Sequence, residues 1–323
     1  MTSDQPLISV LMPAYNHERY VASTVRSILE QDWPRIELIV LDDGSSDGTW
    51  RILQELKAEC EGKLERVVMM TQRNRGVAAT LNRLSGLAHG DFFALIASDD
   101  QYLPGAFRHL IAPMLRDAEI GLVVGQNELM DGESRTCYWD RDREIVYDPT
   151  VAVYRTFNEH LASKGVVENG PGFGDYSEFV RDNHVANGYL IRGTCFRRIL
   201  PYSDENLLED LWLHLQLSKI CRYRAVPEHT FRYRWHAQNL VKQSDRMRAM
   251  AYRTRKWEAD NVSRPENARW RDAFMRGVNR KRVEFRLGRL LELAWVSDLD
   301  TRRRILKVFG LSLTLQRRAM KPM

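Results

Sequence analysis

The sequence predicts an α/β protein built around a mostly parallel sheet with helices on both faces. Over the first 124 residues, short apolar runs alternate with stretches whose apolar residues recur at helical spacing. The apolar runs are nearly continuous rather than alternating, as in Ile36–Leu41, where only Glu37 interrupts the run, which indicates strands buried on both faces of a sheet. The chain of 323 residues is long enough for one large domain with an appendage, or for two domains.

The elements of this first part follow in a regular order. Strands are predicted at Leu7–Met12, Ile36–Leu41, Arg66–Thr71, Asp91–Ala97 and Ile120–Val124. Helices are predicted between them, at His17–Gln31, Thr49–Glu59, Val77–Leu87 and from Pro104 to about Asp117. In the first of these helices, the apolar side chains of Tyr20, Val21, Val25 and Ile28 fall on one face, the pattern of a helix packed on a sheet.

The periodicity fades between Gly125 and about Val185, where Gly, Asn, Asp and aromatic residues are frequent. About sixty residues are too many for a plain loop, so we expect an excursion that builds part of a binding site. Order returns at Tyr189–Arg197, followed by a predicted helix at about Leu207–Ile220. Two strands are then predicted, at Arg222–Val226 and Thr230–Trp235.

The last part of the chain is helical in pattern and basic. Beyond Val241 it carries about 22 Lys and Arg against about 9 Asp and Glu, whereas the remainder is acidic and the whole chain has a net charge of +5. Near the end, the apolar segment Ile305–Leu315 lies between clusters of Arg and Lys, which suits an anionic membrane surface. A helix packed against the body or against a dimer partner explains this segment equally well. Basic charge alone is weak evidence for nucleic-acid binding, and no recognised motif supports it.

Composition excludes several other classes. The longest apolar runs are far shorter than the roughly 20 residues that span a bilayer, and the polar opening Met1–Gln5 does not read as a secretory leader. The four cysteines lie far apart without a C-x-x-C pair, so they predict reduced thiols rather than a disulfide framework or a zinc site. We therefore expect a cytoplasmic protein.

Charged residues follow the predicted strands where each strand ends. Asp42-Asp43-Gly44-Ser45 follows the second strand, Arg73 and Arg75 follow the third, and Ser98-Asp99-Asp100 follows the fourth. Because the carboxyl ends of parallel strands share one edge of the sheet, two carboxylate pairs and a basic pair should meet in one crevice. One pair would suit the neutral groups of a sugar or base, and the other a divalent cation with substrate phosphates.

Each of these motifs also has a purely structural explanation. Asp-Asp-Gly-Ser is a good turn sequence, and Asp99-Asp100 could cap the helix that starts near Pro104. The presence of both carboxylate pairs at the same edge is harder to explain in this way.

The sequence resembles the family 2 glycosyltransferases, which have the GT-A fold. The resemblance runs densely over about the first 115 residues, and more loosely over Tyr189–Asn239. It is carried by Ser9–Asn16, Ile39–Thr49, Asn74–Gly76, Asn82 and Ser98–Asp100. It implies an inverting enzyme that uses Mn²⁺ or Mg²⁺ to move a sugar from a nucleotide-diphosphate sugar to an acceptor. Residues 1–241 would form the GT-A domain, with a nucleotide-binding half at 1–124 and an acceptor-binding half at 125–241, and residues 242–323 a helical basic C-terminal region.

The resemblance also implies roles for residues at the first two strand ends. The backbone of Pro13, Ala14 and Tyr15 would line the base pocket. Asp43 would bind the base, and Asp42 would support its loop.

At the later strand ends, Asp99 would contact the ribose or the donor sugar, and Asp100 would hold the metal that bridges the two phosphates. Ala97 departs from the acidic residue that members with the fuller motif carry, which favours Asp100 as the single carboxylate ligand. Arg75 is a candidate phosphate ligand, although a solvated surface position explains it as well.

Two later segments complete the site that the resemblance implies. Asp210 of the Glu209-Asp210 pair would be the catalytic base, with Glu209 near the acceptor or diphosphate; a helix start also explains two acidic residues. In Tyr233–Asn239, Arg234 would pair with phosphate and His236 would ligate the metal or touch the diphosphate, although a structural histidine is an even alternative.

The predicted partners are a nucleotide-diphosphate sugar, with UDP-sugars favoured, and a saccharide or lipid-linked acceptor in cell-surface polysaccharide synthesis. A lipid-linked acceptor would place the enzyme at the inner face of the plasma membrane as a peripheral protein. The rival interpretations are a nucleotidyltransferase that makes sugar nucleotides and a nucleotide-sugar-binding protein without turnover. The first should show a Gly-rich basic loop after strand one, where this chain has Pro13–Asn16. The oligomeric state is left open.

Overall fold

The computed structural model describes residues 5–203, 205 and 207–280. The strands of this part are β1 (Ile8–Ala14), β2 (Ile36–Asp42), β3 (Arg66–Thr71), β4 (Phe92–Leu95), β5 (Gln101–Tyr102), β6 (Ile120–Met130), β7 (Thr136–Trp139), β8 (Ile145–Val146), β9 (Leu190–Arg192) and β10 (Arg222–Arg234). The helices are α1 (Val21–Leu29), α2 (Thr49–Lys63), α3 (Val77–Leu87), α4 (Ala106–Arg116), α5 (Phe157–Ser163), α6 (Tyr176–Arg181), α7 (Gly193–Ile199), α8 (Glu209–Leu217) and α9 (Ser244–Ser263), with short 3-10 turns η1 (Leu240–Lys242) and η2 (Pro265–Trp270).

The strands form one mixed sheet in the order β3-β2-β1-β4-β9-β6-β10-β5, with β7 paired to β6 and β8 paired to β7. Strands β3, β2, β1 and β4 are parallel neighbours, as the sequence predicts. The short strand β9 runs antiparallel to both β4 and β6, so it joins the first half of the sheet to the parallel pair β6 and β10. The sheet is therefore mostly parallel with an antiparallel insertion.

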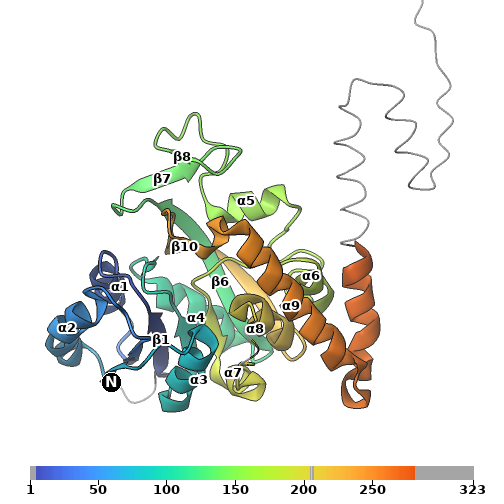
Figure 1. The fold of residues 1–323 in the computed structure, drawn as a ribbon, viewed down its shortest axis with the longest axis horizontal. Helices are drawn as coiled ribbons and strands as arrows, with labels where there is room; N and C mark the ends of the chain where they lie inside the picture. The colour runs from blue at the N-terminus through green and yellow to red at the C-terminus, as the bar shows by residue number, and fades with distance from the viewer. Residues whose placement is uncertain (1–4, 204, 206, 281–323) are drawn as a thin grey trace, which may run out of the picture.

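The two faces of the sheet are covered by different helices (Figure 1). One face packs against α1, α2 and α4, and its core contains Val10, Val40 and Phe107. The other face packs against α3, α6, α7, α8 and α9, and its core contains Leu11 and Ile39. Successive residues of β1 and β2 thus enter opposite cores, which explains why these strands are apolar on both faces apart from the buried pair Ser9 and Glu37.

The region between residues 125 and 185 contains elements that the sequence did not reveal. Strand β6 continues to Met130, beyond the predicted end at Val124, and is followed by the β7–β8 hairpin, which stands out at the top of Figure 1. Helices α5 and α6 follow. The two strands predicted at Arg222–Val226 and Thr230–Trp235 are one strand, β10, whose register against β6 shifts between Ala225 and His229.

Helix α9 is part of the packed body rather than a separate arm. Its Glu258 is buried, forms an ion pair with Lys219 Nζ at 2.7 Å and accepts a hydrogen bond from the Tyr176 hydroxyl at 2.6 Å. The hydroxyl of Thr254, also on α9, accepts a hydrogen bond from the backbone N–H of Leu208. Residues 271–280 are also helical. The helical prediction is confirmed over these residues, whereas the apolar segment Ile305–Leu315 lies outside the described residues. The domain boundary at 241 stays a prediction.

Candidate active site

The loops that follow β1 and β2 are tied to each other at the carboxyl edge of the sheet. Asp43 N–H donates to the Ala14 carbonyl at 2.8 Å, and Asn16 N–H donates to the Ser45 hydroxyl at 2.9 Å. Leu11 of β1 is in register with Leu95 of β4, so the residues after β4 reach the same edge. The prediction that the first four strands deliver their acidic ends to a common edge is confirmed.

Within this edge, the two carboxylates after β2 organise the neighbouring loop. Asp43 accepts the backbone N–H groups of Arg75 and Gly76 at 2.9 and 2.8 Å and the side-chain amide of Gln72 at 2.8 Å. Asp42 Oδ2 accepts from the Ser45 N–H and the Thr71 hydroxyl, while Asp42 Oδ1 is buried with no hydrogen-bond partner among the described residues. Both carboxylates thus fix the loops at this edge, and base binding by Asp43 stays a prediction.

Gly44 is required where these two loops meet. Its φ is +76°, and a Cβ at this position would lie 2.8 Å from Asn74 N and 3.0 Å from Gln72 O. Any side chain would push the β2–α2 loop away from the β3–α3 loop.

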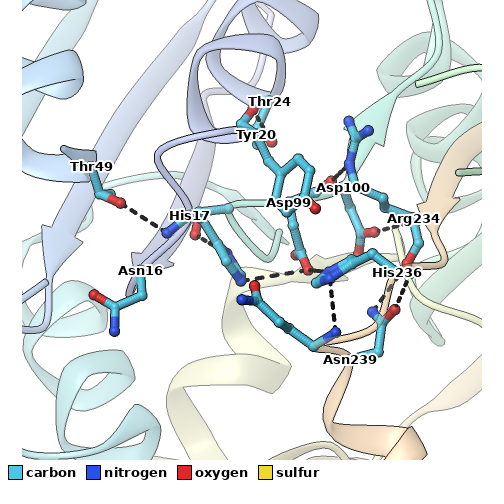
Figure 2. A network of polar contacts seen from close by, with 12 residues as sticks. Asn16, His17, Tyr20, Thr24, Thr49, Asp99, Asp100, Arg234, His236 and Asn239 are labelled. Carbon is cyan, nitrogen blue, oxygen red and sulfur yellow. Dashed lines mark hydrogen bonds and ion pairs between the residues drawn. The ribbon is translucent and has the colours of Figure 1, made fainter. Parts of the chain in front are cut away.

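A cluster of two histidines and one carboxylate lies beside this edge (Figure 2). His236 Nε2 is 3.0 Å from Asp99 Oδ2, and His17 Nε2 is 3.7 Å from the same oxygen. His17 Nδ1 is hydrogen-bonded to the Ser98 hydroxyl at 2.8 Å, and the Asn239 side chain accepts the N–H of His236. One ligand atom from each of His17, Asp99 and His236 lies within 4.8 Å of the others, so the three could hold a metal ion.

This cluster changes the predicted assignment of the metal. The sequence placed the metal on Asp100 with His236, whereas the structure pairs His236 with Asp99. Burial raises the pKa of Asp99, but the His236 hydrogen bond and the nearby His17 outweigh it and keep the pKa below its ordinary value. Burial lowers the pKa of His17, against the opposing charge of Asp99. Sequence reasoning missed His17 because it placed this residue at the start of a helix, whereas α1 begins at Val21.

Arg234 holds the consecutive carboxylates in place. It is fully buried, its backbone N–H donates to Asp100 Oδ1 at 2.8 Å, and its guanidinium donates to the Asp99 carbonyl at 2.6 Å. The other guanidinium nitrogens donate to the Asp131 carbonyl and to the hydroxyls of Ser134 and Ser23. The expectation that Arg234 pairs with phosphate is wrong for this structure, because the guanidinium is buried and its N–H groups are bonded to acceptors inside the protein.

The remaining acidic residues meet in a cavity of about 170 Å³. Asp100 reaches it from the loop after β4, and Glu209 and Asp210 reach it from the first turn of α8. The rest of the lining is mainly apolar and aromatic: Pro13, Val77, Leu81, Leu95, Ile96, Ala97, Asn187, Tyr189, Tyr202, Leu213 and Phe231. The cavity therefore joins the carboxylates predicted for the donor side and for the base.

The three carboxyl groups in this cavity all have pKa values raised above the ordinary range. Burial raises the pKa of Asp210 to about 6. Burial, with the charge of Asp210 as the next cause, raises the pKa of Glu209 to about 8. Burial and then the charge of Asp99 raise the pKa of Asp100 well above its usual range. Such shifts are common where a carboxyl group must exchange a proton near neutral pH.

The other predicted nucleotide-binding residues are spread along the rim. Pro13 lines the cavity, Ala14 is buried, and Tyr15 is 48% exposed beside them. Arg75 is exposed, and its backbone N–H binds Asp43. The residues expected to bind nucleotide thus share one edge of the sheet, and Arg75 contributes an exposed positive charge there.

This arrangement of sheet, helices and acidic edge defines a GT-A glycosyltransferase fold. A mannosyltransferase from Pyrobaculum calidifontis, solved with GDP-Man and Mn²⁺, matches with a TM-score of 0.60 at 16% identity, over 95% of this chain and 80% of that one. S. aureus TarS 1–349 in complex with UDP matches with a TM-score of 0.55 at 17% identity, over 94% of this chain and 79% of that one.

Residues 9–166 match the model of glycosyl transferase family 2. Chondroitin synthase from Escherichia coli is 29% identical over 231 residues, which are 69% of this chain and 32% of that protein. A UDP-Glc:alpha-D-GlcNAc-diphosphoundecaprenol beta-1,3-glucosyltransferase from Escherichia coli, WfgD, is 29% identical over 147 residues, 45% of this chain and 55% of that protein. The chain spans about a third to about a half of the length of these relatives. Within its described part, no helix is both long and apolar enough to cross a membrane.

Proposed function

We propose that this chain is an inverting glycosyltransferase that moves a sugar from a nucleoside-diphosphate sugar to a saccharide or lipid-linked acceptor of a bacterial surface polymer. The observation that carries the proposal is the cavity in which Asp100, Glu209 and Asp210 meet, one residue along the chain from the His17–Asp99–His236 cluster. The names of the relatives support the acceptor class, and the nucleotide-bound neighbours support the donor class.

Asp210 is the proposed general base. It lies in the first turn of α8 and lines the cavity, and its raised pKa makes its carboxylate a stronger base than an ordinary Asp. The carboxylate takes the proton of the acceptor hydroxyl while that oxygen forms a bond to the anomeric carbon. The bond between the anomeric carbon and the diphosphate oxygen breaks in the same displacement, which inverts the configuration.

The His17–Asp99–His236 cluster fits a divalent transition metal. Its donors are two imidazole nitrogens and a carboxylate oxygen, a mixed set that suits Mn²⁺ better than Mg²⁺, which prefers oxygen ligands throughout. When bound, such an ion supplies Lewis-acid stabilisation of the charge on the departing diphosphate. Ser98 and Asn239 orient the cluster through their hydrogen bonds to His17 and His236.

The nucleotide is proposed to lie along the edge formed by the ends of β1, β2 and β3. Asp43 fixes the loop that carries Arg75, whose exposed guanidinium is available to a phosphate. A lipid-linked acceptor would bring the enzyme to the inner face of the plasma membrane. The basic segment beyond residue 280 is the candidate contact, and it lies outside the described residues.

The test is a turnover assay of the purified full chain with Mn²⁺ and a panel of nucleotide sugars, measuring release of the nucleoside diphosphate. Asp210→Asn is expected to lower turnover by about 10²- to 10⁴-fold while nucleotide binding persists. Asp260→Asn, which makes the same change at an exposed position of α9, is the matched control and should keep full turnover. Near-normal turnover of Asp210→Asn would remove Asp210 as the base.

A further inference from the structure

The cavity at the centre of the proposed site is bordered by α3, the loop after β4 and the first turn of α8. It lies between Asp100 and the base candidate Asp210, the place of the transferred glycosyl group if the proposed function holds. What lines this cavity therefore bears on which donor sugars fit.

The lining contains three carboxyl groups and no positive group. Asp100, Glu209 and Asp210 face the cavity, and none of the described residues that line it is Lys, Arg or His. A carboxyl group is either neutral or negative, so no protonation state of these three would neutralise an anionic substituent. An ionised one would repel it.

The cations nearest to these carboxyl groups do not reach the cavity. The guanidinium of Arg234 donates to Asp99, Asp131, Ser134 and Ser23 and is fully buried. Arg246 has a weak electrostatic effect on Glu209, but it is exposed on α9, bonded to Gln243, and absent from the lining. An anionic sugar substituent in this cavity would thus leave water without a counter-charge from the described residues that line it.

The remaining walls are apolar or aromatic. Val77 and Leu81 come from α3, Leu95 from β4, Leu213 from α8 and Phe231 from β10. These side chains suit the C–H face of a sugar ring, a methyl group or an acetamido methyl, while the carboxyl groups and Asn187 accept or exchange hydrogen bonds with hydroxyls. The carboxylate of a hexuronate placed against such a surface would lose its hydration without gaining a hydrogen-bonded or charged partner.

We infer that the donor sugar is uncharged, a neutral hexose, deoxyhexose or N-acetylhexosamine, and that hexuronates are excluded. This inference rests on the proposed function and adds a substrate class to it. The feature that discriminates the two classes of donor is the charge of the substituent at C6 of the sugar. The nucleobase and the diphosphate are the same in both classes, and both would use the same metal ion.

The experiment compares donors that differ only at C6. The full chain with Mn²⁺ is given UDP-glucose or UDP-glucuronate, UDP-galactose or UDP-galacturonate, and GDP-mannose or GDP-mannuronate. Release of nucleoside diphosphate is measured, together with binding by calorimetry. The neutral member of an accepted pair is expected to have a kcat/KM higher by on the order of 100-fold. The uronate should bind no more tightly than the bare nucleoside diphosphate.

A uronate turned over as well as, or better than, its neutral partner overturns the inference and leaves the proposed function standing. Failure of every nucleotide sugar and every nucleoside diphosphate to bind overturns the proposed function, and the inference with it. A charge-insertion variant gives an independent check. Val77→Arg places a guanidinium on the cavity wall and is expected to shift the ratio of uronate to neutral turnover by about tenfold toward the uronate.

Ala79→Arg is the matched control for this variant. It adds the same cation to the same helix at a residue that does not line the cavity, and the ratio should stay at the wild-type value. The inference that a missing counter-charge excludes uronates is overturned if the ratio of uronate to neutral turnover is unchanged in Val77→Arg. It is also overturned if this ratio changes equally in both variants.

Discussion

Replacing the buried carboxyl group of Asp210 by an amide is expected to make the protein more stable at pH 8 while it removes turnover. The physical reason is that a residue placed for catalysis is ionised in surroundings that disfavour its charge. Asp210 lies in a mainly apolar cavity beside two further carboxyl groups, and burial is the cause of its raised pKa. The amide keeps the shape of the side chain and cannot ionise.

The magnitude follows from the shift. The pKa of Asp210 rises from its ordinary value of 3.8 to about 6, and about two pKa units at roughly 1.4 kcal/mol each give about 3 kcal/mol. Because the folded state binds this proton more tightly than the unfolded chain, the contribution is fully present below about pH 4. It is lost as the pH rises through about 6. Asp210→Asn lacks this loss, so its free energy of unfolding at pH 8 should exceed that of the wild type by up to about 3 kcal/mol.

The assay is urea unfolding of wild type, Asp210→Asn and the exposed control Asp260→Asn at pH 4.5, 6 and 8, without metal or nucleotide. The stability gain of Asp210→Asn should grow between pH 4.5 and 8, and Asp260→Asn should follow the wild type at each pH. Turnover of Asp210→Asn is measured on the same samples. A variant that is less stable than wild type by a similar amount at every pH would refute the reasoning, because that result indicates damaged packing rather than a removed charge.

Three further outcomes test other parts of the site. His236→Ala should weaken Mn²⁺ binding by about tenfold or more, measured from the paramagnetic resonance signal of free Mn²⁺. The control is His229→Ala, which changes an exposed histidine of β10 and should leave Mn²⁺ affinity unchanged. Equal affinities of the two variants would show that the cluster is not a metal site. Arg234→Met should lower the free energy of unfolding by about 3 kcal/mol or more in urea, because it removes the donor to several buried acceptors, and a wild-type midpoint would contradict this. A chain ending at Asp298 should lose binding to anionic vesicles but keep turnover on soluble acceptors. If the shortened chain still binds vesicles, the removed C-terminal segment is not the membrane contact.

The first half of the fold could be predicted because its signals are local. Short, nearly continuous apolar runs such as Ile36–Leu41, bounded by turn residues and alternating with helical patterns, favour strands covered on both faces. The turn residues at their ends mark one common edge. The positions of Asp43 and Asp99 near that edge followed from strand direction, whereas that of Asp210 followed from the family resemblance alone.

The second half could not be predicted because its signals are short or distant. Strand β9 has three residues, too few to show a period, yet it determines how the two halves of the sheet join. The cluster that joins His17 to Asp99 and His236 connects residues far apart in the sequence, and nothing around His17 distinguishes it from the first residue of a helix. A buried arginine such as Arg234 also has no local signature, because its acceptors come from three other segments.

The placement of Arg234 explains why two adjacent carboxyl groups can serve different purposes. Asp99 turns toward the histidines and Asp100 toward the cavity. The backbone N–H of Arg234 holds Asp100, its guanidinium holds the Asp99 carbonyl, and Tyr20 covers that guanidinium at 4.7 Å. Residue 234 therefore contacts both carboxyl positions, through its backbone at Asp100 and through its guanidinium at Asp99. A change of the Arg234 side chain should release the backbone of Asp99, beside the candidate metal cluster, while the backbone N–H to Asp100 remains.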